Sequence, residues 1–341
     1  MADTVLVTGG TGFLGGHCIA RLLDRGYDVR TTVRDGAREP AVRAAVAAAG
    51  ADAGPRLTVG VANLEADDGW DAAVAGCRYV LHVASPFPPV QPADADELIR
   101  PARDGALRVL RAALSADVER VVQTSSIAAV RPDRDSSAAQ PYTEADWTDP
   151  SNTSRTPYVR SKTIAEQAAW TLARESGAER RLATVCPGAI IGPALNDDHS
   201  FSLQTISRLL GGLPAVPRLG FTFVDVRDVA DLHILAMTEA AGGGERFIAT
   251  DRFLWMAEVA QVLRERLGDD ARKVPTRNAP DLLIRAIGIF DKSVRSVVGD
   301  LGRQSWFSSD KARSTLGWTT MPVEDSITDC ARTLVAQRNA A

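Results

Sequence analysis

The sequence predicts an α/β fold, in which helices cover both faces of a doubly wound parallel sheet and a smaller mixed α/β domain follows. Short apolar segments alternate with longer helical segments along the first half of the chain, and this alternation is typical of a parallel sheet. A glycine-rich turn separates the first apolar segment from the first helical one. After Pro193 the alternation gives way to longer loops, which indicates a second domain.

The expected strands are apolar segments of strand length, bounded by turn residues or by helical sequence. They are residues 5–8, 28–33, 57–61, 79–85 and 120–126. Helices are expected over residues 17–25 and over residues 94–114, the latter with a break near Pro101, whose nitrogen carries no hydrogen. Residues 221–240 are expected to return to the first domain. The division assigns residues 1–190 and 221–241 to the first domain, and residues 191–220 and 242–341 to the second.

The composition excludes several classes of partner. The chain has 39 Lys and Arg residues against 43 Asp and Glu, a net charge of −4, whereas nucleic-acid binding favours a basic surface. No apolar run is long enough to span a bilayer, and the first residues do not resemble a secretion signal. The cysteines are scattered without a C-x-x-C pair, as is typical of a reducing compartment. We therefore expect a cytoplasmic protein without a membrane or nucleic-acid partner.

The glycine-rich turn predicts a dinucleotide site. Gly10, Gly12 and Gly15 have the G-x-G-x-x-G spacing, and Gly9, Gly12 and Gly15 have a wider variant of it. The turn follows a predicted strand, opens a helix and is followed by a second strand, which is the context that the motif requires. Glycines there let the backbone approach a pyrophosphate at the positive end of a helix. The first domain is therefore expected to be Rossmann-like.

The end of the second strand indicates which dinucleotide binds. Arg34 comes directly after this strand and Arg38 follows shortly after. Arginine at this place favours a 2′-phosphate, whereas an acidic residue favours a free ribose hydroxyl. NADP(H) is therefore expected over NAD(H). Asp35 leaves the alternative open, because it could bind the ribose while Arg34 is merely solvated.

The candidate catalytic pair is Tyr158 and Lys162. Residues four apart share a helix face, so the ammonium of Lys162 can favour the ionised form of the Tyr158 phenol. Ser125 and Ser126 end the fifth predicted strand, at the sheet edge where ligands of α/β folds bind. His82 is interpreted as a core histidine within an apolar strand, and no His, Cys and carboxylate cluster predicts a metal.

The chain resembles the extended short-chain dehydrogenase/reductases. The resemblance rests on the glycine turn, the serines at 125–126, the Tyr158-x-x-x-Lys162 spacing and the segment 223–230. Residues 29–34, 81–86 and 121–126 look like the branch of dihydroflavonol 4-reductases, cinnamoyl-CoA reductases and aldehyde (carbonyl) reductases. The resemblance implies a catalytic triad of Ser126, Tyr158 and Lys162.

The resemblance also implies which residues hold the cofactor. Two positions depart from the family pattern: Asn63 replaces an acidic residue at the adenine, and Asp104 replaces an asparagine that serves a proton relay, so this relay is in doubt. The resemblance implies Thr11, Gly12, Phe13 and Leu14 at the pyrophosphate, Arg34 at the 2′-phosphate, Asn63 and Leu64 at the adenine, Val83, Ala84 and Ser85 at the ribose, and Pro187, Gly188 and Ile190 beside the nicotinamide. The other expected cofactor contacts are Gly9, Gly15, Arg38, Thr124, Tyr158 and Lys162.

The resemblance implies a reversible, NADPH-dependent reduction of a ketone or aldehyde, with Tyr158 as general acid and base. We expect a small, apolar or aromatic carbonyl substrate and a monomer or homodimer. Two alternatives stay open: an epimerase or dehydratase of sugar nucleotides that retains NAD, and a redox-sensing module that binds NADP(H) without chemistry. Candidate substrate contacts, each of which would equally suit a core position, are Ser85, Phe87, Ile127, Phe201 and Phe221.

Overall fold

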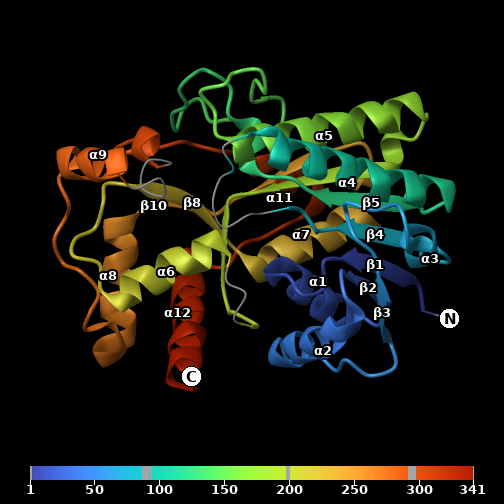
Figure 1. Cartoon of the computed structure of the whole chain (residues 1–341), viewed down its shortest axis with the longest axis horizontal. Helices are drawn as coiled ribbons and strands as arrows, with labels where there is room; N and C mark the ends of the chain where they lie inside the picture. The colour runs from blue at the N-terminus through green and yellow to red at the C-terminus, as the bar shows by residue number, and fades with distance from the viewer. Residues whose placement is uncertain (1, 87–91, 93, 197–199, 291–296, 341) are drawn as a thin grey trace.

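The computed structural model shows a larger sheet domain joined to a smaller group of helices and strands (Figure 1). It describes residues 2–86, 92, 94–196, 200–290 and 297–340. Phe87, one of the candidate substrate contacts, lies outside the described residues. The predicted fold class, a Rossmann-like sheet with helices on both faces and a smaller mixed α/β part, is confirmed.

The main sheet has seven parallel strands. The strand order reverses between β1 and β4, and ligands of open α/β sheets bind at such a reversal, beyond the carboxyl ends of the strands. In spatial order the strands are β3 (Leu57–Val61), β2 (Asp28–Val33), β1 (Thr4–Thr8), β4 (Tyr79–His82), β5 (Arg120–Thr124), β6 (Leu182–Pro187) and β9 (Arg246–Ala249).

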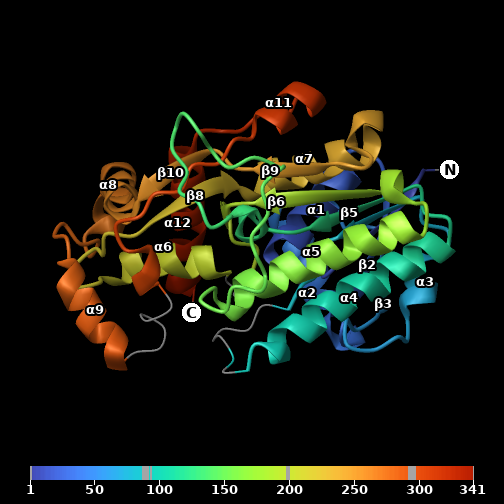
Figure 2. The same cartoon turned by 90° about the horizontal axis from the view of Figure 1, so that it is seen from above.

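Helices cover both faces of this sheet because its central strands are apolar on both sides. Val5 and Val7 of β1 face a core shared with α1 and α7, whereas Leu6 faces a core shared with α4 and α5. Figure 2 shows α4 and α5 side by side along the sheet. The helices of this domain are α1 (Phe13–Asp24), α2 (Glu39–Ala48), α3 (Trp70–Val74), α4 (Asp96–Ser115), α5 (Pro157–Glu175) and α7 (Val226–Thr238), with the short 3-10 helices η1 (Gly36–Arg38), η2 (Ile127–Val130), η3 (Glu179–Arg181) and η4 (Ala240–Gly242).

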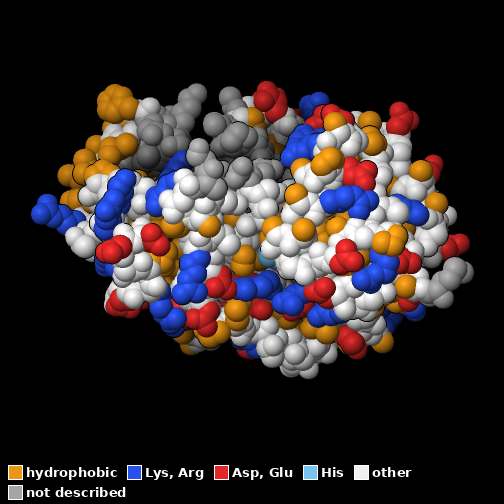
Figure 3. All heavy atoms as spheres, turned by 90° about the horizontal axis from the view of Figure 1, so that it is seen from below, with side chains coloured by type: hydrophobic (Ala, Val, Ile, Leu, Met, Phe, Trp, Pro, Cys, Tyr) orange, Lys and Arg blue, Asp and Glu red, His pale blue; other side chains and the backbone are white. Residues whose placement is uncertain are grey.

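The smaller part is built on a three-stranded sheet in which β8 pairs in parallel with β7 and antiparallel with β10. Apolar side chains of α9 gather at one end of the molecule (Figure 3), where Leu282 and Phe290 are among the most exposed. The elements of this part are β7 (Ala189–Ile191), α6 (Phe201–Gly211), β8 (Gly220–Asp225), β10 (Arg252–Trp255), α8 (Met256–Leu267), η5 (Gly268–Ala271), α9 (Asp281–Phe290), η6 (Val298–Asp300) and α12 (Val323–Ala340). Helix α11 (Asp310–Leu316) instead packs against β9, η4 and α7 of the larger domain.

The structure corrects several predicted boundaries. Helix α1 begins at Phe13 rather than at residue 17, so the glycines at 15 and 16 belong to the helix and not to the turn before it. Helix α4 runs through Pro101 without the predicted break. A proline inside a helix loses one backbone hydrogen bond and its ring clashes with the preceding turn, at a cost of about 3 kcal/mol. The packing of the buried face of α4 against α5 outweighs this cost. Strands β4 and β5 end at His82 and Thr124, earlier than predicted.

The second half of the chain crosses the predicted domain division. Residues 221–240 do not all return to the first domain, since β8 lies in the smaller sheet while α7 packs on α1. Strand β9, assigned to the second domain, pairs in parallel with β6 and forms the edge of the main sheet. Pairing with distant strands decides these positions, and a short apolar segment does not specify its partner.

Candidate active site

A small pocket lies beyond the carboxyl ends of β4 and β5, against α4 and α5. It brings together predicted site residues from distant parts of the sequence, among them Ser85, Thr124 and Lys162. The pocket is lined by His82, Ala84, Ser85, Ala102, Ala106, Gln123, Thr124, Ser125, Lys162 and Ala165. It therefore coincides with the sheet edge at which the sequence predicts the site.

Ser126 and Tyr158 meet at this edge. Ser126 begins η2, its hydroxyl accepts a hydrogen bond from the backbone N–H of Ala128 at 3.1 Å, and it also hydrogen-bonds to the phenol of Tyr158. Tyr158 lies in the first turn of α5, which Pro157 opens. Burial raises the pKa of Tyr158, and the hydrogen bond with Ser126 lowers it. The net shift is upward, opposite to the one favoured by the Tyr-Lys spacing alone, because burial outweighs the hydrogen bond.

Lys162 lies one helical turn beyond Tyr158, with its Nζ atom 5.9 Å from the centre of the phenol ring. Burial lowers the pKa of Lys162 to about 8, and Cys186 and Glu166 oppose this shift. Burial also raises the pKa of the Cys186 thiol far above its usual value, so the thiol is neutral at physiological pH. The carboxylate of Glu166 is therefore the negative charge that supports the ammonium of Lys162.

The glycine turn fits a pyrophosphate. Gly9 has a φ of +77°, and a Cβ atom on Gly15 would lie 2.3 Å from the carbonyl oxygen of Gly9. Gly12 begins α1; no side chain of a described residue caps it, and the first turn contains no acidic residue. The first N–H groups of α1, at Phe13 and Leu14, are thus oriented for an anion. The carbonyl of Thr11, in the same turn, accepts a hydrogen bond from Asn196 at 3.1 Å.

Arg34 and Arg38 extend this site beyond β2. Both side chains are exposed, and neither forms an ion pair with a described residue. Asp35 between them accepts a hydrogen bond from the backbone N–H of Ala37 at 2.9 Å and caps η1. Asp35 thus has a structural partner, whereas neither guanidinium group is held in an ion pair with a described residue, which leaves both available to a phosphate.

The predicted adenine residues follow β3. The side-chain oxygen of Asn63 accepts from the backbone N–H of Glu65 at 3.1 Å, and Leu64 packs closely against Gly105 of α4. Asp104, also on α4, forms a 2.7 Å ion pair with Arg103, which lowers the pKa of its carboxyl group. A half-exposed carboxylate in an ion pair is poorly suited to a proton relay, in agreement with the doubt raised by the sequence.

The predicted nicotinamide residues lie between the two sheets. Pro187 ends β6, Ile190 lies in β7, and Gly188 joins these strands at a point where a Cβ atom would lie 2.3 Å from the carbonyl oxygen of Thr222. None of these three predicted residues lines the pocket. Of the predicted ribose residues, Ala84 and Ser85 line it; the backbone N–H of Ala84 donates to the hydroxyl of Thr8, and Val83 packs against the core.

The candidate substrate residues divide into two groups. Phe201 and Phe221 form an edge-to-face pair with ring centres 6.1 Å apart, and Phe201 is 45% exposed. Ile127 instead packs in a small apolar cluster with Tyr142 and Cys186. The aromatic pair is thus the more accessible group.

The buried histidines have structural partners. His82 hydrogen-bonds to the hydroxyl of Thr8 at 2.9 Å, and burial lowers its pKa to about 3, as the interpretation of a core histidine requires.

Within the described ranges no three metal-ligating side chains are gathered at one point, and each helix is too short or too polar to span a bilayer. Glu166 was not predicted as a site residue, although it lies four residues after Lys162 and hence on the same helix face.

Comparisons with known proteins agree with this geometry. The model of the NAD dependent epimerase/dehydratase family matches residues 5–249. A cinnamoyl-CoA reductase (CAD2) of Medicago truncatula is 35% identical over 305 residues, which cover 85% of this chain and 91% of the relative. Tetraketide alpha-pyrone reductase 1 of Arabidopsis thaliana is 32% identical over 341 residues, covering 98% of this chain and 95% of the relative.

Solved structures give the same result. The yeast methylglyoxal/isovaleraldehyde reductase Gre2 complexed with NADPH superposes with a TM-score of 0.82 at 25% identity, covering 99% of this chain and 100% of that one. Vestitone reductase from alfalfa (Medicago sativa) superposes with a TM-score of 0.76 at 25% identity, covering 98% of this chain and 99% of that one. The chain therefore belongs to the NAD-dependent epimerase/dehydratase family, among the reductases of the extended short-chain dehydrogenase/reductase type.

Proposed function

We propose that this protein is an NADPH-dependent reductase of ketones or aldehydes that uses Ser126, Tyr158 and Lys162. The observation that carries the proposal is the meeting of Ser126 and Tyr158 in one hydrogen bond, with Lys162 one turn away, beside a glycine turn that fits a pyrophosphate. NADPH, when bound, supplies the hydride that reduces the carbonyl carbon. The expected preference for NADP(H) agrees with the NADPH in the Gre2 structures from yeast and Candida albicans.

The three side chains have separate tasks. Tyr158, whose raised pKa keeps its proton at neutral pH, donates that proton to the carbonyl oxygen of the substrate. Ser126 hydrogen-bonds to the same oxygen as negative charge develops on it. Lys162 carries the positive charge that stabilises the tyrosinate left after the transfer. In the reverse direction Tyr158 accepts the proton from the alcohol.

The substrate class follows from the relatives and from the aromatic pair. The relatives named above are reductases of cinnamoyl-CoA, tetraketide α-pyrones, and methylglyoxal or isovaleraldehyde, all of which contain a reducible carbonyl group. Phe201 and Phe221 offer an apolar surface near β7 and β8. We therefore propose an apolar or aromatic ketone or aldehyde as the substrate.

The test is consumption of NADPH against NADH with a panel of aromatic and aliphatic aldehydes and ketones. We expect turnover with NADPH, and we expect Tyr158→Phe to lower kcat by about 100-fold or more while NADPH binding, measured by fluorescence, is retained. Near-normal turnover of Tyr158→Phe would remove Tyr158 from the mechanism.

A sugar-nucleotide epimerase or dehydratase is the alternative within the same family. Such an enzyme retains NAD and regenerates it in each cycle, so it would copurify with NAD and consume no cofactor. Arg34 and Arg38 favour the reductase, since both guanidinium groups are exposed where a 2′-phosphate would bind. A redox-sensing module without chemistry has no use for three assembled catalytic side chains, and it would give no turnover with any member of the panel.

A further inference from the structure

Glu166 is a fully buried acidic residue directly beneath the proposed triad. It lies four residues after Lys162 and eight after Tyr158 on α5, so the three side chains lie on one face of the helix. Its side chain has 0% exposure. A carboxylate in such a place requires strong partners, because burial of an unpaired charge is very costly.

Besides Trp170 of its own helix, whose Nε1 donates to Oε1 at 3.4 Å, Glu166 has partners on or next to three different strands. Ser125, at the end of β5, donates to Oε2 at 2.6 Å, and Thr184 of β6 donates to Oε1 at 2.8 Å. Arg246 of β9 donates to Oε1 at 2.8 Å and to Oε2 at 3.3 Å. We name Ser125, Glu166, Thr184 and Arg246 the floor cluster. It joins α5 to neighbouring strands of the main sheet.

Arg246 is itself held in place. Its Nη1 group donates to the backbone carbonyls of Glu144 at 2.6 Å and Asp146 at 3.0 Å. The ring of Trp147 lies against the guanidinium, 3.5 Å from ring centre to Cζ. The side chain is only 9% exposed. The arginine therefore presents a fixed donor pair to Glu166 rather than a mobile charge.

We propose that Glu166 is a positioning residue of the triad, whose carboxylate holds the end of β5 and the middle of β6 against the helix that carries Tyr158 and Lys162. Ser125 precedes Ser126 directly, so its bond to Glu166 sets the place of Ser126 relative to α5. Thr184 lies on the strand that leads to Pro187, one of the predicted nicotinamide residues. This inference rests on the proposed function of Ser126, Tyr158 and Lys162.

The charge of Glu166 has a second consequence. It raises the pKa of Lys162 against the lowering effect of burial, and so helps to keep the ammonium protonated. Helix α4 contributes only Ala102 and Ala106 to this side of the pocket. Among the described residues, the titratable groups that face Lys162 are Tyr158 and Glu166 on α5, His82 on β4 and Cys186 on β6. His82 and Cys186 are both neutral at pH 7, because burial lowers the pKa of the one and raises that of the other.

The test replaces Glu166 by its neutral isostere and compares the result with a matched buried carboxylate elsewhere. Asp225 is equally buried, with 0% side-chain exposure, and pairs with Arg227 at 2.8 Å. We expect Glu166→Gln to lower kcat on the order of 10- to 100-fold with little change in the KM for NADPH. We also expect the high-pH limb of the activity profile to move to lower pH, since Lys162 loses a stabilising negative charge. Asp225→Asn should change neither kcat nor the limb.

The outcomes separate this inference from the proposed function. If Tyr158→Phe abolishes turnover but Glu166→Gln behaves like Asp225→Asn, Glu166 is merely structural and the inference is wrong. If the wild type reduces no carbonyl compound, the proposed function fails first. Should Glu166→Gln not fold, Ser125→Ala removes the 2.6 Å bond to Glu166, together with the weaker contact of the same hydroxyl with the neutral thiol of Cys186. Ser125→Ala should lower kcat and leave the high-pH limb of the activity profile in place. An unchanged kcat of this variant would then overturn the inference.

Discussion

Two buried carboxylate–arginine pairs in this protein look alike but differ in their access to solvent. In the floor cluster, Glu166 pairs with Arg246 at 2.8 Å, and their side chains are 0% and 9% exposed. Near the smaller sheet, Asp225 pairs with Arg227 at the same distance, and their side chains are 0% and 24% exposed. Arg227 also has a second acidic partner, Asp329, at 2.9 Å. We name Asp225, Arg227 and Asp329 the junction network.

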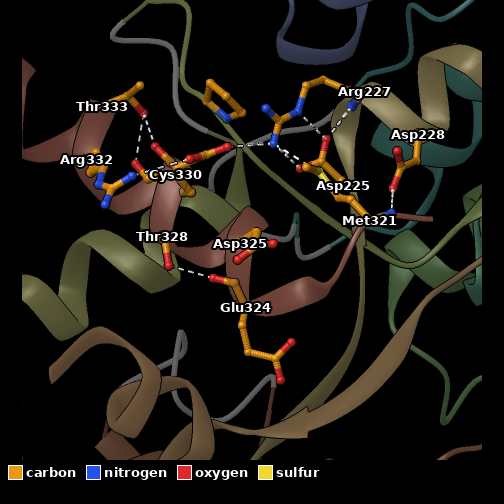
Figure 4. A network of polar contacts seen from close by, with 12 residues as sticks. Asp225, Arg227, Asp228, Met321, Glu324, Asp325, Thr328, Cys330, Arg332 and Thr333 are labelled. Carbon is orange, nitrogen blue, oxygen red and sulfur yellow. Dashed lines mark hydrogen bonds and ion pairs between the residues drawn. The ribbon is translucent and has the colours of Figure 1, made fainter. Parts of the chain in front are cut away.

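The junction network fastens the C-terminal helix to the rest of the molecule (Figure 4). Asp225 ends β8 and accepts from the backbone N–H of Arg227 at 2.7 Å, so it also begins α7. Arg227 then donates to Asp329 on α12 at 2.9 Å. Nearby, Asp228 accepts from the backbone N–H of Met321 at 2.8 Å. This network joins β8 and α12 of the smaller part to α7 of the larger domain, whereas the floor cluster joins elements of the catalytic edge.

The same ion-pair chemistry serves two purposes in this protein, one at the proposed triad and one at the junction with the C-terminal helix. A fully buried pair with a single arginine is intolerant of change, because loss of either partner leaves an uncompensated charge. A pair with partial exposure and a second partner can rearrange or be hydrated. The position of a pair relative to the triad then decides whether its loss affects turnover or only stability.

The largest difference should come from removing each arginine. Arg246→Met leaves Glu166 buried without a counter-charge, and we expect it to lower the free energy of unfolding by about 3–5 kcal/mol. Arg227→Met leaves Asp225 hydrogen-bonded to the backbone N–H of residue 227, beside a side-chain position that is 24% exposed, and we expect a loss of about 1–2 kcal/mol. Urea unfolding of both variants and the wild type measures this. Equal losses would show that the difference in solvent access between the two pairs does not affect the free energy of unfolding.

Acid should destabilise the two regions to a similar extent through their histidines, because burial dominates the pKa of each histidine. Burial lowers the pKa of His82, close to Lys162, to about 3, and that of His17, close to Asp225, to about 4. The unfolded chain binds these protons near pH 6.5, so the stabilisation is complete above that pH and declines as the pH falls toward about 4. The pKa of Asp228, raised to about 6, acts in the opposite sense and favours the folded state below pH 6.

The measurement is the urea midpoint at pH 7 and at pH 5. We expect each buried histidine to contribute a loss of about 2 kcal/mol at pH 5 relative to pH 7. The variants His82→Gln and His17→Gln should each reduce the difference between the two midpoints by a similar amount. A reduction in one variant alone would show that local charges, rather than burial, control the histidines.

The smallest difference should come from single hydroxyl groups. Thr184→Val removes the 2.8 Å bond to Glu166, and we expect a loss of about 1–2 kcal/mol, because a buried charged acceptor loses a donor. Thr328→Val removes a bond to the backbone carbonyl of Glu324 within α12, and we expect a loss below about 1 kcal/mol. Thermal unfolding under identical conditions ranks the two. A larger loss of stability for Thr328→Val would contradict the expectation that a hydrogen bond in the floor cluster contributes more than one within α12.

Much of the main sheet and of the proposed site was predictable because it depends on local sequence. The glycine turn and the strand before it are local features, and the Tyr158–Lys162 spacing follows from helix geometry. Strands β6 and β9 were not predicted, since short apolar segments do not reveal their partners. The break expected at Pro101 was wrong, because packing of α4 against α5 stabilises the helix through that residue. The proposed roles of the cofactor and substrate residues stay predictions.

The sequence alone determined the family, the fold class and the cofactor preference, because turns, helix faces and strand ends are encoded by neighbouring residues. Only the tertiary structure decided what lies beneath the triad. Ser125 and Arg246 are 41 and 80 residues away from Glu166 along the chain, and no local pattern predicts that they meet. The same holds for the pKa of Tyr158, which burial raises although the spacing to Lys162 favours a lower value. Burial depends on how the whole chain packs, so a local sequence pattern predicts it only indirectly.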